Sequence, residues 1–404
     1  MVSVLTKVFG IQNLETAEDI VQQTYLAAIE NWSSKGIPDS PSGWLFMVAR
    51  NKAIDVIRKK KHEVSYNFSD NDRVLLTSEY TLSTSMENLW KEDLVKDDML
   101  RMMFASCQPG ISPENQITLI LKTLCGFSTV EIAKALLTTD DTVSKRLYRT
   151  KEFFREHKTK LEIPSVAELK DRTNAVLNSI YLLFNEGYYS SAKSQVIKND
   201  LMTEAMMLGK LLAENHHTRL PEVFALMALM CFHAARTDSR LSPEGEIILL
   251  PLQDRSRWDQ RLIELGNWYL ADAATGEEMS PYHLEAAIAF EHCTAKSMDE
   301  TNWKRILELY EWLCRISPSP VSELNKIIAV MQVSGAGPAF QLLNELPERK
   351  KLESYYLYHC LLGEICAKLG NEDEAKAEYE LALTLTQSDA EMKILTEKTV
   401  KLKK

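Results

Sequence analysis

The segment from Ser128 to Glu156 constrains the fold of this chain most strongly, because two helix starts follow one another in it. Ser128 with Glu131 is a capping box, a pattern in which each side chain bonds the backbone N–H of the other residue. Residues 138–140, Thr-Thr-Asp, form a second N-cap, and a long basic sequence follows them. A short helix, a tight turn and a longer basic helix predict a helix-turn-helix.

Apolar residues keep helical spacing through most of the remaining chain. The spacing recurs from Thr16 to Trp32, from Pro41 to Lys61 and from Pro164 to the end. The 404 residues include only 14 Gly and 13 Pro, together about 7% of the chain, whereas average usage of this pair is roughly 12%. Because strand-rich proteins need both residues at their many turns, the deficit argues against sandwiches and barrels. We therefore predict an all-α fold.

The net charge of −10 is distributed unevenly along the chain. Residues 1–61 carry 8 basic against 6 acidic side chains, and residues 110–160 carry 9 against 6. The intervening residues 62–109 are acidic, with 4 against 9, and residues 161–404 carry 26 against 36. Anionic partners are therefore expected only for the two basic blocks of the front part.

Motifs of common catalytic sites are missing from the sequence, which has no Gly-rich phosphate loop, G-x-S-x-G or H-E-x-x-H. His216 and His217 have no partner at metal-ligand spacing, and the seven cysteines form no C-x-x-C pair. No apolar stretch approaches the roughly 20 residues that span a bilayer, and the N-terminus lacks the pattern of a signal peptide. We expect no enzymatic activity, no metal or cofactor, no membrane contact and a reducing cytoplasmic location.

Simpler interpretations stay open for several of these features. Basic helix faces are often only solvated, and the basic run 58–61 also suits a helix C-terminus, where cations interact favourably with the dipole. The aromatic residues after Phe184 either pack between helices or line a pocket of the C-terminal part. The residues of this possible pocket are Asn185, Glu186, Tyr188 and Tyr189.

Three blocks of sequence, in their order, resemble the two conserved domains of extracytoplasmic-function (ECF) sigma factors. They are AEDIVQQTYLAAIENW, PSGWLFMVARNKAIDVIRKK and SPENQITLILKTLCGFSTVEIAKALLTTDDTVSKRLYRTKE. YLLFNEGYYSS at 181–191 and LGEICAKLGNEDEAKAEYELAL at 362–383 resemble the ECF group that carries a C-terminal tetratricopeptide (TPR)-type extension. The resemblance implies sigma domain two in residues 1–62, an acidic linker in 63–108, sigma domain four with the helix-turn-helix in 109–160, and a TPR-like helical extension in 161–404. Relatives have a further stretch before the position of Met1, so we expect the first domain to be N-terminally short.

The same resemblance implies a bacterial factor that binds core RNA polymerase, directs it to promoter DNA and is regulated by its extension. The residues that would contact polymerase are Asp19, Gln22, Gln23 and Tyr25. Those that would meet the −10 element are Asn51, Lys52, Asp55, Arg58 and Lys59. Those on the helix that would read the −35 element are Thr142, Ser144, Lys145, Arg146 and Arg149. A protein or small ligand on the extension would be a further partner.

A transcription regulator that acts without polymerase is the alternative interpretation. It would combine the helix-turn-helix with a TPR-type sensor domain. Such a protein would bind duplex DNA tightly by itself, whereas free sigma factors usually bind promoter DNA poorly. Binding to DNA in the absence of polymerase therefore separates the two hypotheses.

Overall fold

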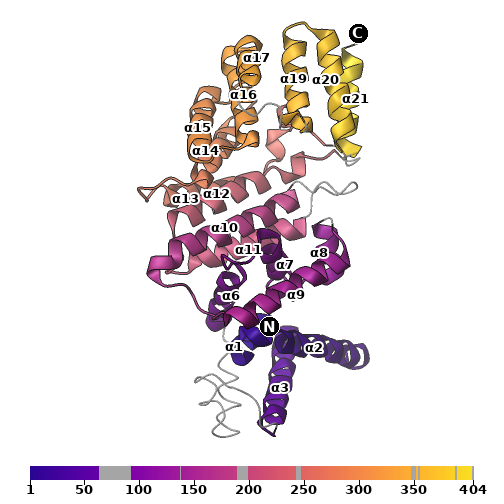
Figure 1. The fold of residues 1–404 in the computed structure, drawn as a ribbon, viewed down its shortest axis with the longest axis vertical. Coiled ribbons are helices and arrows are strands. Elements are labelled where there is room, and N and C mark those ends of the chain that lie inside the picture. Colours follow the sequence, from indigo (N-terminus) through magenta and orange to yellow (C-terminus); the bar gives the residue numbers. More distant parts are fainter. Residues whose placement is uncertain are drawn as a thin grey trace. The chain divides into compact units, whose positions relative to one another are not determined.

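The architecture is helical throughout the described part of the chain (Figure 1), and this confirms the all-α prediction. The computed structural model describes residues 1–62, 92–136, 138–188, 199–242, 247–346, 352–353, 355–386 and 389–402. One isolated bridge, between Leu241 and Ile247, is the extended pairing found in these ranges. The chain divides into two compact units, Met1–Ile180 and Tyr181–Lys404.

The first unit begins with three helices that pack on one another. Its elements are α1 (Val2–Phe9), η1 (Ile11–Asn13), α2 (Leu14–Lys35), α3 (Pro41–His62), α6 (Glu92–Ser106), α7 (Pro113–Thr123), α8 (Thr129–Ala135), α9 (Asp140–His157) and the first half of α10 (Val166–Tyr188). Gly36, at a φ of 81°, ends α2, and Pro41 occupies the first turn of α3. Most of the expected linker lies outside the described residues, and helical structure resumes at Glu92.

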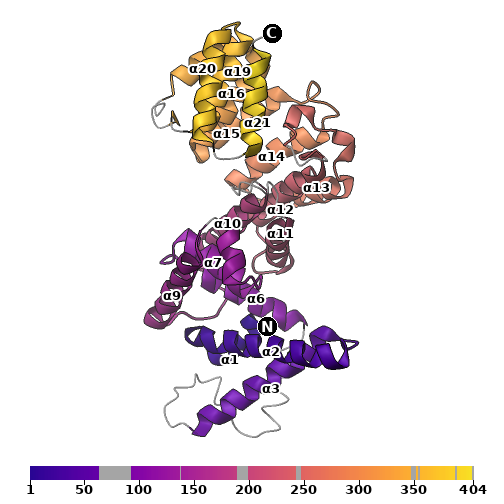
Figure 2. The same cartoon turned by 90° about the vertical axis from the view of Figure 1, so that its right-hand side faces the viewer.

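The first three helices lie close to one another (Figure 2), and their buried side chains form a small apolar core. Leu5 of α1, Ile20 of α2 and Ala53 and Ile57 of α3 are all buried in it. The apolar spacing of residues 41–61 also predicts Met47 on the inner side of α3, but its side chain is 45% exposed. The small Ala49 and Ala53 lie on the buried face of α3 instead, and they allow the helices to approach closely.

Buried polar contacts join the later helices of this unit. Ser179 of α10 donates to Gln116 of α7 at 3.0 Å, and the guanidinium of Arg172 donates to the carbonyl of Phe104 in α6. Because buried polar groups need partners, these bonds hold the first half of α10 to α6 and α7. The compact unit consequently extends to Ile180.

The second unit is a succession of helices with several single turns of 3-10 helix. After the second half of α10 come α11 (Asn199–Glu214), α12 (Pro221–Ala234), η2 (Thr237–Ser239), η3 (Leu250–Leu252), η4 (Arg255–Arg257), α13 (Gln260–Ala273), α14 (Pro281–Thr294), α15 (Trp303–Ile316), α16 (Pro320–Ser334), α17 (Ala336–Asn344), α19 (Tyr356–Lys368), α20 (Glu372–Leu385) and α21 (Asp389–Lys401).

Helix α12 is the buried centre of the second unit. Its residues from Val223 to Phe232 are all buried, and α11, α13 and α14 pack around it. A helix that is apolar on every face requires neighbours on every side. Two glycines permit this packing, since a Cβ on Gly209 would lie 2.5 Å from the Met227 sulfur and one on Gly266 would lie 2.6 Å from the Phe232 ring.

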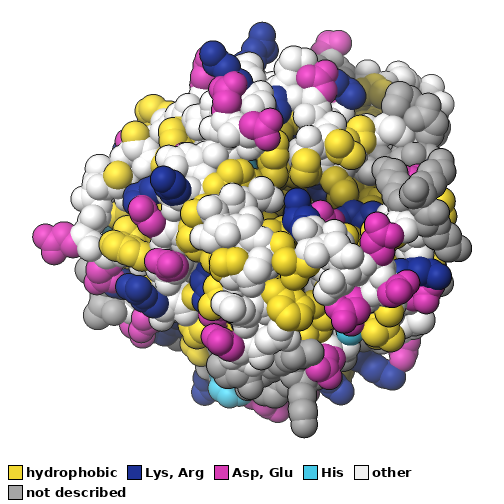
Figure 3. Space-filling view, turned by 90° about the horizontal axis from the view of Figure 1, so that it is seen from above, with side chains coloured by type: hydrophobic (Ala, Val, Ile, Leu, Met, Phe, Trp, Pro, Cys, Tyr) yellow, Lys and Arg dark blue, Asp and Glu magenta, His cyan; other side chains and the backbone are white. Residues whose placement is uncertain are grey.

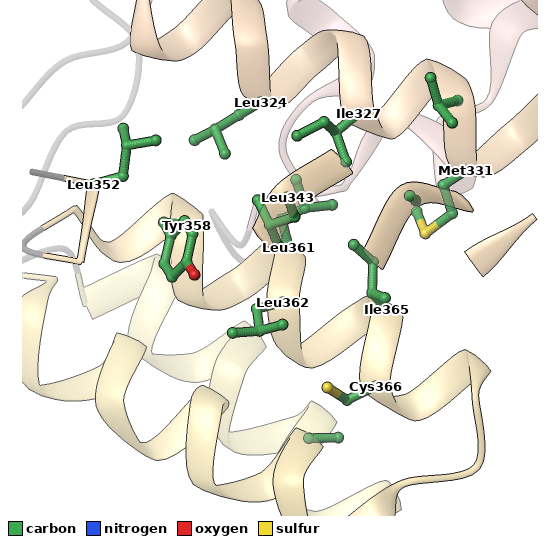
Figure 4. Close-up of a cluster of buried hydrophobic side chains, with 13 residues drawn as sticks. Leu324, Ile327, Met331, Leu343, Leu352, Tyr358, Leu361, Leu362, Ile365 and Cys366 are labelled. Carbon is green, nitrogen blue, oxygen red and sulfur yellow. The ribbon is translucent and has the colours of Figure 1, made fainter. Parts of the chain in front are cut away.

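The last helices pack around a separate apolar cluster, shown in Figure 4. Ile327 of α16, Leu343 of α17 and Ile365 of α19 are fully buried there. Helices α19 and α20 lie side by side (Figure 1), where Gly363 makes room for the ring of Tyr379. In the face shown in Figure 3, charged side chains of both signs are interspersed around apolar ones.

Candidate functional site

The expected pair of helices α8 and α9 is present, and both predicted caps are formed. Ser128 accepts from the N–H of Glu131 at 3.2 Å, while the Glu131 carboxylate accepts from the N–H of Ser128 at 2.7 Å. Thr139 accepts from the N–H of Thr142 at the start of α9. Because these bonds satisfy orphan donors of the first turns, both helices begin where the sequence predicts.

One face of α9 is buried and holds it against its neighbours. Val143 and Leu147, four residues apart, lie in the interior, and Phe154 continues the same stripe two turns later. Helices α7 and α8 both pack against α9. The opposite face is therefore presented away from the small helical core.

The five candidates for −35 recognition lie in the first half of α9. Ser144, Lys145 and Arg149 are exposed, whereas Thr142 and Arg146 are half-buried. Lys145 pairs with Asp141 at 2.6 Å, but both side chains are well exposed, so the pair is easily exchanged for another partner. Within the described ranges Arg149 makes no hydrogen bond or ion pair, so its guanidinium is available to an anion.

The candidates for −10 recognition lie along the C-terminal part of α3. Asn51, Asp55, Arg58 and Lys59 are exposed, and Lys52 is half-buried. Asp55 lies 3.7 Å from Arg58 across one turn, a distance typical of a weak surface pair. The helix thus brings five polar side chains together along its outer side.

The candidates on α2 form an exposed surface that is partly apolar. Asp19, Gln22 and Gln23 are exposed and Tyr25 is 50% exposed. Two large apolar neighbours are exposed as well, Leu26 at 59% and Ile29 at 68%.

Sequence reasoning missed the apolar part of this α2 surface. Tyr25 and Ile29 are among the apolar positions that keep helical spacing in this segment, yet both side chains are exposed. The spacing of Gln22, Tyr25, Leu26 and Ile29, at i, i+3, i+4 and i+7, was a signal for a shared outer face.

Two ion pairs connect the second half of α9 to the start of α2. Lys151 lies 2.8 Å from Glu18, and both side chains are mostly buried. Arg155 lies 3.0 Å from Glu15 and also pairs with Glu152 on its own helix. The last lysine and the last arginine of α9 are thus paired with carboxylates, whereas Lys145 and Arg149 remain on the outside.

The residues of the possible pocket in the C-terminal part are mostly packed against other side chains. Tyr188 is only 1% exposed, with the Arg240 guanidinium carbon 3.8 Å above its ring centroid. Asn185 and Glu186 are half-buried, and Tyr189 lies outside the described residues. The neighbouring Tyr181 donates to Glu285, and burial raises the pKa of both groups.

Sequence reasoning also missed a group of buried basic side chains around the ends of α12 and α14. Arg236 and His292 are each 9% exposed, and Arg255 lies close to both. The signal was a local one, namely four arginines within the short stretch from Arg236 to Arg257, between two helices. Buried cations require partners, so this density indicates more than solubility.

Two kinds of feature are absent from the described ranges. No cluster of His, Cys, Asp and Glu there has the arrangement needed to hold a metal ion. No helix there combines the length and hydropathy needed to cross a bilayer.

Comparison with known families identifies two segments. Residues 2–63 match sigma-70 region 2, and residues 172–274 match a family of unknown function, DUF6596. The first match covers α1 to α3. The second covers the end of the first unit and the helices α11 to α13.

Three relatives extend these matches. The chain is 31% identical over 380 residues to the uncharacterized protein R00370 of Rhizobium meliloti, covering 94% of this chain and 88% of that protein. It is 28% identical to the ECF RNA polymerase sigma factor SigW of Bacillus subtilis over 36% of this chain and 76% of SigW. It is 24% identical to the ECF RNA polymerase sigma factor SigX of the same species, over 37% of this chain and 74% of SigX. No solved structure matches.

Proposed function

Because residues 2–63 match sigma-70 region 2 and the front part of the chain is similar to two ECF sigma factors, we propose that this protein is an ECF-type sigma factor that binds core RNA polymerase and directs promoter-specific initiation. The observation that carries the proposal is the exposed surface of α2 within the matched region 2. Its polar side chains surround Tyr25, Leu26 and Ile29, which are 50–68% exposed. Such an apolar group with a polar rim is typical of a protein interface.

The two basic segments supply the DNA contacts in this proposal. Helix α9 acts as the recognition helix of a helix-turn-helix, with Ser144, Lys145 and Arg149 entering the major groove at the −35 element. The outer side of α3 meets the −10 element through Asn51, Lys52, Asp55, Arg58 and Lys59. All of these side chains except the half-buried Lys52 are exposed, which supports both assignments, since Lys and Arg neutralise phosphates and Asn and Ser bond base edges.

The domain limits inferred from the sequence complete the proposal. Residues 1–62 and 109–160 are the two sigma domains, 63–108 is the linker, and 161–404 is a TPR-like extension that regulates initiation. The close packing of α19 against α20 at Gly363 supports a TPR-like pair. The extension is also the part expected to receive a protein or small ligand.

Run-off transcription with purified core polymerase and a promoter library tests the proposal. The full chain should support promoter-specific transcripts only when core polymerase is present. An Asp19→Ala/Ile29→Ser variant should lose transcription and co-purification with core polymerase. A Glu30→Ala variant, changed on the same helix, should retain both. Failure of the wild-type chain to bind core polymerase would refute the proposal.

A separate measurement tests the DNA contacts. Arg149→Ala should weaken promoter use and lower the slope of log K against log salt by about one unit if Arg149 contacts a phosphate. Lys160→Ala, an exposed change just beyond α9, should leave the slope unchanged. Tight binding of the free protein to duplex DNA would instead favour the polymerase-independent regulator.

A further inference from the structure

The buried basic cluster of the second unit has an unusual charge balance. It is formed by His233 and Arg236 at the end of α12, Arg255 and Trp258 around η4, and His292 near the end of α14. Arg236 and Trp258 are 9% and 3% exposed. Isolated charges are costly to bury, so each cation in such a place needs an explanation.

The burial of Arg255 is explained by its hydrogen bonds to the C-terminal end of α14. Its Nη1 donates to the carbonyls of His292 at 2.7 Å and Ala295 at 2.6 Å, and its Nη2 lies 3.3 Å from the Thr301 hydroxyl. These carbonyls belong to the last turn of α14 and the residue after it, where acceptors lack partners within the helix. Arg255 is therefore a structural residue.

Arg236 has no comparable explanation. Its Nε donates a long hydrogen bond of 3.4 Å to the side-chain amide oxygen of Gln253. Its guanidinium carbon lies 5.4 Å from the Trp258 ring centroid. Throughout the described ranges it forms no ion pair with a carboxylate. The nearby Asp238 and Asp254 are exposed, and Asp254 accepts from Ser256 instead. The planar donor fork of a mostly buried guanidinium is left without an anion.

Further polar groups around Arg236 lack partners among the described residues. The Trp258 indole nitrogen and the Nδ1 atoms of His233 and His292 are buried without a hydrogen bond. The pKa of each histidine is lowered to about 3, first by burial and then by Arg236 and other neighbours, so both rings are neutral at pH 7. An indole N–H is a donor only, and neutral imidazoles provide one donor each. Among the described residues, an indole donor without an acceptor and two imidazole nitrogens without a partner thus lie around a cation without an anion.

We propose that Arg236, with Trp258 and His292 beside it, binds the phosphate or carboxylate group of a small molecule. The guanidinium fork matches two oxygens of either group, and the neutral N–H donors suit a third contact. This names a ligand class for the extension. It rests on the proposed function only for its effect on transcription, because binding itself requires neither polymerase nor DNA.

Thermal unfolding of the full chain at pH 7 and constant ionic strength tests the proposal. Sodium phosphate, sodium acetate and sodium citrate are compared with sodium chloride. A ligand that binds only the folded protein raises its melting midpoint, here by about 3 °C or more at saturation. A rise with phosphate alone assigns a phosphate ligand, and a rise with acetate or citrate alone assigns a carboxylate. No rise with any of these anions overturns the proposal.

Two variants locate the effect at Arg236. Arg236→Gln should abolish the anion-dependent rise, whereas Arg261→Gln, an exposed change on α13, should retain it. Because Arg236→Gln removes an unpaired buried cation, its midpoint in chloride should equal or exceed that of the wild type. A retained rise in Arg236→Gln overturns the proposal.

Two more variants cover the remaining outcomes. If Arg236→Gln does not fold, Arg236→Lys replaces it as the test. This variant keeps the charge but loses the two-pronged donor of the guanidinium, so its affinity for the anion should fall at least about tenfold. Glu244→Gln/Glu246→Gln, changed in residues that lie outside the described ranges, tests whether the chain supplies its own anion. Anion binding that appears only in this variant overturns the proposal.

Discussion

The ion pair between Lys151 of α9 and Glu18 of α2 should couple these two helices energetically. Nζ and Oε2 lie 2.8 Å apart, and the side chains are 16% and 12% exposed. At an effective dielectric constant near 20, this distance corresponds to about 6 kcal/mol of gross attraction. Removal of both ions from water offsets most of this attraction, so that about 2 kcal/mol of coupling remains.

A double-mutant cycle in the full chain measures this coupling. Lys151→Met, Glu18→Gln and the double variant are unfolded with urea and followed by far-ultraviolet circular dichroism. Each single substitution leaves one ion without its partner in a mostly buried place. The double variant should therefore be about 2 kcal/mol more stable than the sum of the two single effects.

A second ion pair of the same length provides the control. Arg305 and Glu308 on α15 also lie 2.8 Å apart, but their side chains are 53% and 60% exposed. Their coupling should stay below about 0.5 kcal/mol, since water screens the charges. If the coupling of Lys151 with Glu18 is no larger than that of this control, the two helices do not share a desolvated contact in solution and the reasoning is refuted.

Three further perturbations test the buried groups. Lowering the pH from 7 to 5 should destabilise the second unit, because His233 and His292 have a pKa of about 3 when folded and must release protons that the unfolded chain binds below about pH 6.5. The free energy of unfolding should fall by about 1.4 kcal/mol per pH unit for each ring. A urea midpoint that stays constant between pH 7 and 5 would contradict this. Asp98→Asn should raise the urea midpoint at pH 7, because burial raises the pKa of Asp98 despite its pairing with Lys7. The wild type therefore loses stability as the pH rises from the unfolded-state pKa through the folded one, and a lower midpoint for the variant at pH 7 would argue against this. Phe154→Ala should cost about 3–5 kcal/mol by urea unfolding, since the ring is fully buried; a loss below about 1 kcal/mol would show that α9 packs differently.

Much of the helical framework was predictable because its signals are local. Ser128 and Glu131 lie three residues apart and form their capping box whatever surrounds them. Gly36 and Pro41 end one helix and begin the next through backbone conformation alone. The outward face of α9 follows from the same kind of signal, because the buried Val143 and Leu147 set its inner face. The assignment of residues on that helix to the −35 element came from the family resemblance instead.

The exposed apolar surface on α2 shows where this local reasoning stops. Helical spacing places Tyr25 and Ile29 among apolar neighbours, but it does not say how many faces of a helix are covered. Helices α1 and α3 cover only one side of α2, so Ile29 stays 68% exposed. Which faces of a helix become buried depends on helices distant in sequence. The sequence of one helix alone does not predict where those helices pack.

The sequence alone determined that this chain is helical, where α8 and α9 begin, and which blocks of it carry positive charge. Helix propensity, caps and composition act within a few residues, so they survive without any tertiary context. Only the tertiary structure decided that Glu18 meets Lys151 across 133 residues and that Arg236 lies beside Trp258 and His292 with no carboxylate paired to it among the described residues. The reason is physical: desolvation and pairing depend on everything that surrounds a charge, and that surrounding exists only after the helices have packed.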